Sequence, residues 1–484
     1  LPQGELVLPG LDTGLDEDSW AQIGEDHPQY NIKKLLAAAG AARADVSDWP
    51  LRHETPVNHA RVRLLSEAMR PAETTERWRQ LTPHDIPQTA LDGLTRIDCD
   101  TPQEEADVIA LILREALQTP GKTAALITPD RRLARRVTLS MRRWGIDIDD
   151  SGGQPLTELP VGAWLMLCAE MAEQSLAPIA LLSLLKHPVM AAGIPADDMR
   201  RMTYTLDQMA LRGPRPSAGF AGLRAAIEKL AGEKQQDNKK DLLAWLDKIE
   251  PIATPFMALM EEGAEKPFRQ MLEAHIKLAE DLAATTESAG ASRLWLGEAG
   301  EGASQLLQQL LAAALDVPPL APAHYVPLLR MLMKSVTVRP RYGMHPRLSI
   351  LGQVEARLYC ADMVILGGLN EGTWPALPAH DPWMSRPMRR DFGLPSPEKA
   401  LSLAAHDFVQ AASAPEVILT RAQKVDGTPT VPARWLLRID AVLEAVGLAL
   451  PQAAGQRYRQ WRQDMDTPAA IQPAPRPAPT PPLH

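Results

Sequence analysis

The pattern of apolar residues changes twice along the chain, and this constrains the fold more than any other feature of the sequence. Residues 93–160 and 338–446 carry short apolar runs typical of buried strands, with helical periodicity between them. Residues 161–337 instead place apolar residues three and four apart, which predicts an all-helical block. Each flanking half has too few strands to cover its own edges. We therefore expect one α/β parallel sheet, interrupted by a large helical insertion and completed after it.

Local signals place the expected elements. Thr101-Pro102-Gln103-Glu104 is a capping box with Pro at the first helical position, so a helix should begin there and end near Pro120-Gly121. Before the insertion we expect a helix at Pro129–Trp144 and strands at 4–10, 124–128 and 146–148. After it we expect a helix at Glu398–Ser413 and strands at 348–352, 363–367 and 416–420.

Composition narrows the function classes. The net charge of −9 means that any contact with nucleic acid must come from a local basic groove. Cys99, Cys168 and Cys360 lie far apart, which argues against a disulfide scaffold or a Cys-only zinc site and indicates a reducing cytoplasm. No run of 18 apolar residues occurs, so we expect no membrane span. Pro473–Pro482 is typical of an extended linker, and we expect the chain to be the interior of a longer protein.

Several short motifs have ordinary structural explanations. Gly121-Lys122-Thr123 lacks the first glycine of a phosphate-binding loop and leads into a strand, so we interpret it as a turn. The arginines concentrated in residues 131–143 could neutralise phosphates, although a solvated or salt-bridged helix face is the default interpretation. Asp149-Asp150 and Asp197-Asp198 have no further ligand at metal spacing, which favours turns and helix caps.

The densest polar segment lies between two expected strands. Gln353, Glu355 and Arg357 follow the strand at 348–352, and a glycine-rich stretch then leads from the next strand to Trp374-Pro375. Ligands of open α/β sheets bind beyond the carboxyl ends of the strands, so these side chains are candidate ligand contacts. A structural ion pair between Glu355 and Arg357 is the alternative.

Some of these segments resemble a known family. Gly352–Leu358, Val364–Pro375 and Asp381–Met388 are similar to the AddB subunits of bacterial double-strand-break repair helicase–nucleases, of the alphaproteobacterial type. Shorter matches run over nearly the whole chain, including Leu6–Asp12 and Gly427–Leu436.

The resemblance implies a superfamily 1 (UvrD-like) helicase-like fold whose second RecA-type domain is split by a helical insertion. On this resemblance, residues 1–92 are the C-terminal remnant of a first helicase-like domain, and residues 93–160 and 338–446 are the two halves of the second RecA-like domain. Residues 161–337 are the all-helical insertion, and residues 447–484 are a Pro-rich linker toward a missing nuclease domain. At the matched motor positions the ribose-binding Glu is Cys360, and no arginine finger stands at Val409–Ala412. Thr420-Arg421-Ala422 looks like that finger but follows a strand and lies too late in the chain.

We therefore expect no enzymatic activity from this chain, and no cofactor in it. ATP and magnesium would serve the parent helicase–deoxyribonuclease complex. The implied partners are single-stranded and duplex-end DNA and an AddA-type motor subunit. The rival hypotheses are an active superfamily 1 DNA-dependent ATPase and a helical scaffold without a DNA role. The resemblance also implies a set of DNA contacts: Arg70, Gln353, Glu355, Arg357, Asn370 and Trp374. In this set Arg357 would supply charge and Trp374 a stacking face, unless Trp374 is an ordinary core residue.

Overall fold

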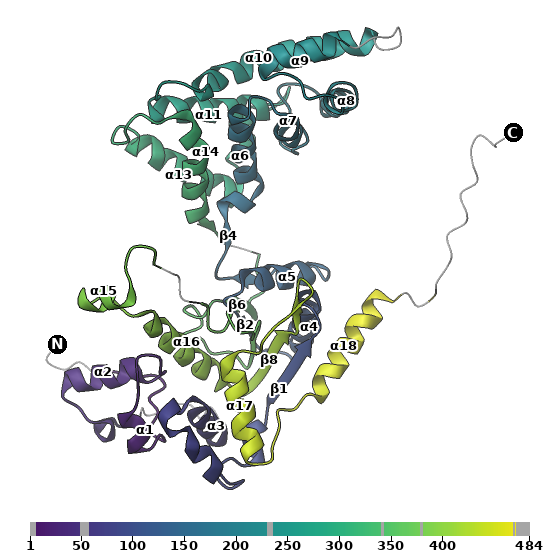
Figure 1. The fold of residues 1–484 in the computed structure, drawn as a ribbon. Coiled ribbons are helices and arrows are strands. Elements are labelled where there is room, and N and C mark those ends of the chain that lie inside the picture. The colour runs from purple at the N-terminus through teal and green to yellow at the C-terminus, as the bar shows by residue number, and fades with distance from the viewer. Residues whose placement is uncertain are drawn as a thin grey trace. The chain divides into compact units, whose positions relative to one another are not determined.

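The computed structural model describes residues 6–48, 58–229, 236–339, 343–377, 381–467 and 470. The chain divides into two compact units. The first, which we call the sheet unit, combines both ends of the chain, Leu1–Gly152 and Tyr342–His484. The second, the helical unit, is Gly153–Arg341 (Figure 1).

One sheet of six parallel strands organises the sheet unit, and its order is β1-β8-β7-β2-β6-β3. The strands are β1 (Leu94–Cys99), β2 (Ala124–Ile127), β3 (Asp149–Asp150), β6 (Leu348–Leu351), β7 (Met363–Leu366) and β8 (Glu416–Ala422). β2 from before the helical unit pairs with β6 and β7 from after it, with Ala124 opposite both Leu348 and Met363. The expectation of a single interrupted α/β sheet is thus confirmed.

Apolar residues on both faces explain why the central strands are buried. In β2, Ala124 and Leu126 pack into one hydrophobic cluster, while Ala125 and Ile127 pack into another on the opposite face. Such continuous apolar runs are typical of parallel strands that helices cover on both sides. The first cluster includes α4 (Pro102–Ala116) and α5 (Arg131–Arg142); the second includes α3 (His59–Met69), α16 (Pro397–Ala412) and α17 (Arg434–Ala445).

The helix α4 begins as its capping box predicts. Thr101 accepts a hydrogen bond from the Glu104 amide at 3.2 Å, and Pro102 occupies the first turn. The Glu104 carboxylate accepts from the Asp100 amide at 2.8 Å, one residue before the cap. The remaining helices of the sheet unit are α1 (Glu17–Ala21), α2 (Tyr30–Ala39), α15 (Arg386–Asp391) and α18 (Ala453–Asp466).

Two strand predictions were wrong. Described residues 6–10 form loop and turn instead of the strand expected at 4–10, and residues 4–5 lie outside the described part of the chain. The strand expected at 146–148 lies at Asp149–Asp150, where the predicted turn should have been. Its position is set by pairing with β6, Asp149 opposite Ser349, and the apolar Ile148 before it is buried as an anchor.

The helical unit contains α6 (Pro160–Glu173), α7 (Pro178–Leu185), α8 (Ala196–Leu206), α9 (Gly219–Glu228), α10 (Gln236–Met260), α11 (Phe268–Ala283), α12 (Gly290–Leu294), α13 (Gly297–Ala313) and α14 (Pro322–Ser335). At its centre, the buried His275 ring is bonded through Nδ1 to the Tyr325 hydroxyl and through Nε2 to the Leu165 carbonyl, both at 2.9 Å. β4 (Gln154–Pro155) pairs antiparallel with β5 (Thr337–Val338), so the two ends of this unit lie side by side.

None of the helices among the described residues is both long enough and apolar enough to cross a bilayer.

Candidate nucleic-acid interface

The carboxyl ends of the parallel strands define the edge of the sheet where α/β proteins bind ligands. The loop 352–360 follows β6 at this edge and is folded by its own backbone: the Ala356 amide donates to the Gly352 carbonyl at 3.0 Å. Leu358 has a φ of 62°, in the left-handed region, and its side chain is 78% exposed. Gln353, Glu355 and Arg357, three of the predicted DNA contacts, lie in this loop.

Arg357 is committed to an ion pair that the sequence did not indicate. Its Nε and Nη2 donate to the two carboxylate oxygens of Asp407 on α16, at 2.7 and 3.0 Å. Asp407 is buried, whereas the Arg357 side chain remains 40% exposed. The hydrogen bond from Asp407 raises the pKa of Arg357. The alternative prediction, an ion pair between Arg357 and Glu355, was wrong about the partner: Arg357 pairs with Asp407. The ion pair therefore attaches the loop 352–360 to α16.

Gln353 and Glu355 differ in how far they are open to a ligand at the edge of the sheet. Glu355 is exposed, and its carboxylate lies over Gly352, where an added Cβ would come within 2.4 Å of Oε2. Gln353 is half-buried, and its Nε2 has no hydrogen-bond partner among the described residues. Glu355 can therefore accept bonds from a ligand at this edge, whereas the Gln353 amide nitrogen is itself buried and would have to turn outward to reach one.

Asn370 belongs to a buried network and not to an open surface. Its Nδ2 donates to the Ala422 carbonyl at 3.0 Å, and its Oδ1 accepts from Arg421 Nε at 3.1 Å. Arg421 also bonds Asp98 at 3.1 Å and Thr430. A contact between DNA and Asn370, as predicted, would need this network to open. The prediction is corrected: Asn370 ties the loop after β7 to the end of β8.

Asp98 is the carboxylate on which this network depends. Burial would raise its pKa, but the hydrogen bonds and charge of Arg96, and the charge of Arg421, outweigh burial and hold the pKa below its usual range. Arg96 in turn bonds Asp440 on α17 at 2.7 Å. The network therefore links β1, β8 and α17 through ionised groups.

Trp374 does not offer the stacking face that was predicted. Its side chain is fully buried, and the indole Nε1 donates to the Gly367 carbonyl at 2.9 Å. The ring centroid lies 6.0 Å from that of Phe408 and 6.1 Å from that of Trp435, both edge-on. The alternative holds: Trp374 is a core residue between the loop after β7 and helices α16 and α17.

Arg70, the first residue after α3, is also turned inward. The side chain is 3% exposed and forms a fork on Glu67, with both bonds at 2.8 Å. It also bonds Asp16 and Ser19 near the start of α1. The predicted DNA contact is corrected, because a guanidinium with these partners holds the N-terminal segment against α3.

A buried carboxyl group that was not among the predicted site residues lies at the same edge of the sheet. Glu105 on α4 accepts from the Gly368 amide and from the Thr420 hydroxyl, both at 2.7 Å and both on Oε1. Burial raises its pKa to about 7, against these two hydrogen bonds. A signal was present: Glu105 lies three and four residues before the buried Val108 and Ile109, on the apolar stripe of the helix.

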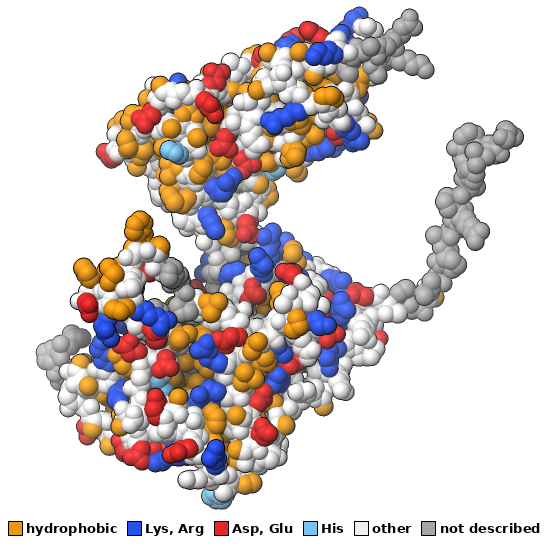
Figure 2. Space-filling view, in the orientation of Figure 1, with side chains coloured by type: hydrophobic (Ala, Val, Ile, Leu, Met, Phe, Trp, Pro, Cys, Tyr) orange, Lys and Arg blue, Asp and Glu red, His pale blue; other side chains and the backbone are white. Residues whose placement is uncertain are grey.

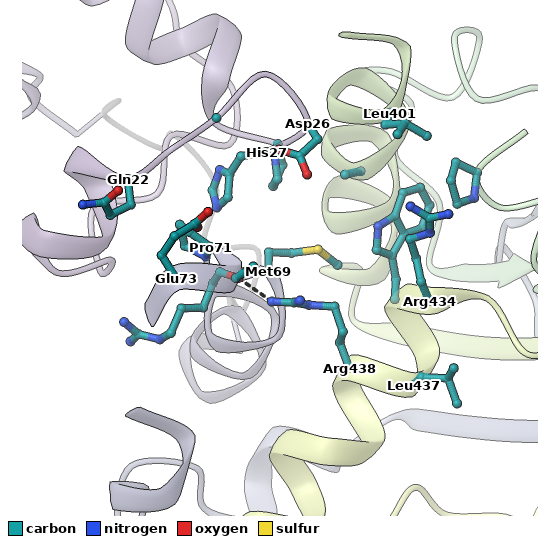
Figure 3. Close-up of a pocket in the computed structure, with 17 residues that line it drawn as sticks. Gln22, Asp26, His27, Met69, Pro71, Glu73, Leu401, Arg434, Leu437 and Arg438 are labelled. Atoms are coloured by element: carbon teal, nitrogen blue, oxygen red, sulfur yellow. Dashed lines mark hydrogen bonds between the residues drawn. The ribbon is translucent and has the colours of Figure 1, made fainter. Parts of the chain in front are cut away.

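A cavity of about 470 Å³ lies between the N-terminal segment and helices α16 and α17 (Figure 3). Arg438 faces it and donates to the Ala68 carbonyl at 2.5 Å and to the Arg70 carbonyl, with Trp78 against its guanidinium at 5.0 Å. Burial lowers the pKa of His27 to about 4, and the nearby Arg438 and Lys33 charges act in the same direction. The Arg70 and Arg438 guanidinium groups are already bonded within the chain, so they are poorly placed to bind a phosphate.

At least three of the six arginines in residues 131–143 have ion pairs among the described residues, in line with the default interpretation of a solvated or salt-bridged face. Arg131 bonds Asp150, Arg142 bonds Asp147, and Arg143, just after the helix, bonds Asp466. Among the described residues, no group of three or more His, Cys, Asp or Glu side chains is arranged to hold a metal ion.

Comparison with known proteins adds one similarity of limited extent. No protein-family profile matches the chain. An uncharacterized protein of Rickettsia felis is 29% identical over 94 residues. That alignment covers 19% of this chain and 11% of the relative. The chain is thus similar to a small part of an uncharacterized bacterial protein.

Proposed function

We propose that this chain is the non-motor, helicase-like part of an AddB-type subunit of an ATP-dependent helicase–exonuclease for double-strand-break repair and recombination. It would bind single-stranded DNA and an AddA-type motor subunit in the cytoplasm. The observation that carries the proposal is the position of the helical unit between β3 and β6 of one continuous parallel sheet. This is the organisation that the resemblance implies for the split second domain of superfamily 1 helicases. The motif segments at 352–388 support the same assignment.

Two side chains support a role without ATP hydrolysis. Arg421, which resembles an arginine finger, is 5% exposed and bonded to Asn370, Asp98 and Thr430. Phosphoryl transfer needs a positioned charge at the phosphate, and this guanidinium is committed elsewhere. Cys360 stands at the position matched to the ribose-binding Glu and cannot supply a carboxylate. These residues do not fit an ATP site, and ATP with magnesium is assigned to the partner motor.

The proposed DNA path follows the carboxyl edge of the sheet along the loop 352–360. Glu355 presents a polar group there, the buried amide of Gln353 would have to turn outward to contribute, and Arg357 holds the loop in place through Asp407. Trp374, Asn370 and Arg70 are structural in this proposal. With a net charge of −9, binding should depend on few cations and weaken as salt is added.

The test combines two measurements on the purified chain. Fluorescence anisotropy with a fluorescein-labelled oligothymidylate at increasing salt should show weak, salt-sensitive binding. Phosphate release from ATP should stay at background with and without DNA. DNA-stimulated release that Arg421→Ala abolishes would instead identify an active ATPase. If no salt-sensitive binding occurs at any concentration, the chain is a scaffold without a DNA role and the proposal fails.

A further inference from the structure

The segment 381–396, which carries α15, exposes large apolar side chains to an unusual degree. Trp383 is 87% exposed, Phe392 74% and Met388 47%. Figure 1 shows this segment projecting beside α16, and in Figure 2 hydrophobic atoms gather at the same place with Lys and Arg atoms beneath them. We call it the α15 segment. Folded proteins seldom leave a Trp and a Phe this open in a single short segment without a binding role.

The backbone of the α15 segment is held by its own polar groups. Asp381 Oδ1 accepts from the amides of Trp383 and Met384, at 2.9 and 3.2 Å. Asp381 Oδ2 binds Arg389 at 2.6 Å, and Arg389 also donates to the Pro395 carbonyl at 3.2 Å. The conformation that presents Trp383 is therefore fixed without any contact made by the indole ring.

A cavity of about 490 Å³ lies between the α15 segment and α2, and its charged lining is mostly basic. The charged lining residues are Lys34, Arg386, Arg390, Lys399, Glu25 and Glu398. Glu398 pairs with Arg386 at 3.0 Å, and Glu25 accepts from the Ser396 and Tyr30 hydroxyls. The cavity thus has more cations than carboxylates, although the whole chain carries a charge of −9.

Three of these cations are free to bind an anion. Lys34, Arg390 and Lys399 have no carboxylate within ion-pair distance among the residues that the structure describes, in contrast to Arg131 and Arg142 of α5 and to the arginines bonded to Asp98. Trp383 and Phe392 do not line the cavity, but Phe392 follows Arg390 by two residues in the same segment. Cations and exposed aromatic rings on one surface can hold a single strand, because phosphates bind the charge and unstacked bases stack on the ring.

We propose that the α15 segment is a binding surface for single-stranded nucleic acid, with Trp383 and Phe392 as base-stacking residues and Lys34, Arg390 and Lys399 as phosphate contacts. This inference rests on the proposed function and gives the strand a second contact, distinct from the loop 352–360. A duplex fits less well, because its bases are already stacked and cannot cover the indole face. An apolar protein surface would cover Trp383 but leave the three cations without partners.

The experiment measures anisotropy of a fluorescein-labelled oligothymidylate bound to the full chain and to single variants. Trp383→Ala should weaken binding about 5- to 150-fold, the range for losing one base stack, and Trp383→Phe should restore most of it. Arg390→Ala should lower the slope of log affinity against log salt by about 0.7, the value for one phosphate contact on a single strand. Both side chains are exposed, so circular dichroism should be unchanged.

Matched controls come from the helical unit. Tyr204→Ala removes a ring that is 65% exposed, and Lys248→Ala removes an exposed lysine; both should bind as the wild type does.

Three outcomes would overturn the inference, and they are distinguishable. If the wild type binds the oligonucleotide but Trp383→Ala and Arg390→Ala match their controls, the α15 segment is not the contact, while the proposed function stands. If those variants instead lose association with the AddA-type motor at unchanged DNA affinity, the surface docks a protein. Failure of the wild type itself to bind would remove the proposed function as well.

Discussion

Glu105 places an ionisable group in the interior of the sheet unit. Its carboxyl group is 2% exposed and its pKa is raised to about 7 from the ordinary 4.5. Between these two values the folded chain keeps a proton that the unfolded chain has lost. The free energy of unfolding should therefore fall as pH rises from about 4.5 to about 7, because deprotonation then favours the unfolded state.

We predict that Glu105→Gln removes this pH dependence. The amide oxygen of Gln can still accept from Gly368 and Thr420, and the group no longer ionises. We compare the free energy of unfolding of the variant with that of the wild type at two pH values. Relative to the wild type, the variant should gain about 3 kcal/mol between pH 4.5 and pH 7.5. Urea unfolding followed by tryptophan fluorescence at both pH values measures it. Glu104→Gln on the same helix is the control, and equal shifts in the two variants would contradict the prediction.

For the predicted DNA contacts, the sequence located the segment at the edge of the sheet better than it identified what each side chain binds. The segment 352–375 does follow β6 and β7 at the carboxyl edge, as the strand pattern indicated. Whether an arginine there faces solvent or a carboxylate depends on a residue far along the chain: Arg357 meets Asp407, and Arg421 meets Asp98. Sequence spacing carries no information on such pairs. The dipeptide Trp374-Pro375 is compatible with a core position and with a surface position. The contact of the Trp374 ring with Phe408 in the folded chain shows that Trp374 is a core residue.

At the scale of the elements, the bounds of helices and strands could be predicted from the sequence where the element is buried and its apolar residues form a clear pattern. Strands β2, β6, β7 and β8 were predicted within two residues because most of their residues are apolar and buried. The edge strand β3 was displaced by three residues, since it makes just two residue pairs with β6 and its boundary depends on those pairs. The helix α16 was predicted within one residue because its amphipathic stripe is long.

The pair Arg357–Asp407 connects a loop to a helix, and we predict that it stabilises the sheet unit. Arg357→Ala should cost about 1–3 kcal/mol, because it leaves the buried Asp407 carboxylate without its partner. In an Asp407→Asn background the same substitution should cost less, since no buried charge remains. A double-mutant cycle from urea unfolding gives the coupling energy. If the cycle returns no coupling, and Arg357→Ala reduces only DNA binding, the guanidinium acts on the strand and not on the fold.

At the scale of the whole molecule, each strand of the first half lies next to strands of the second half in the sheet. β1, β2 and β3 come from before the helical unit, and none of them neighbours another in the order β1-β8-β7-β2-β6-β3. The first half of the sheet unit therefore has no native strand pair of its own. We predict that residues 1–160 expressed separately show no cooperative unfolding transition, because every strand would expose both edges.

The helical unit should be dispensable for the fold of the sheet. β4 and β5 lie side by side, Gln154 opposite Val338, so a short Gly-Ser turn can join Pro155 to Thr337. We predict that this excised chain retains a cooperative transition and slow hydrogen exchange at the amides of β2 and β7. Rapid exchange at β2 in a chain that still has β6 and β7 would show that the helical unit is needed to form the sheet.

The closeness of β4 and β5 also bears on the order of events during synthesis. When β3 leaves the ribosome, the strands that pair with β1, β2 and β3 have not yet been made, and roughly 190 residues of the helical unit come first. Folding of that unit brings its two ends together. The connection between β3 and β6 then behaves as a short link and no longer as a long flexible loop. This lowers the entropic cost of closing that loop when the sheet assembles by about 3 kcal/mol. If the helical unit folds first, we therefore expect it to hold the end of β3 near the chain that will form β6, so that the first-half strands can pair as soon as the second half is made.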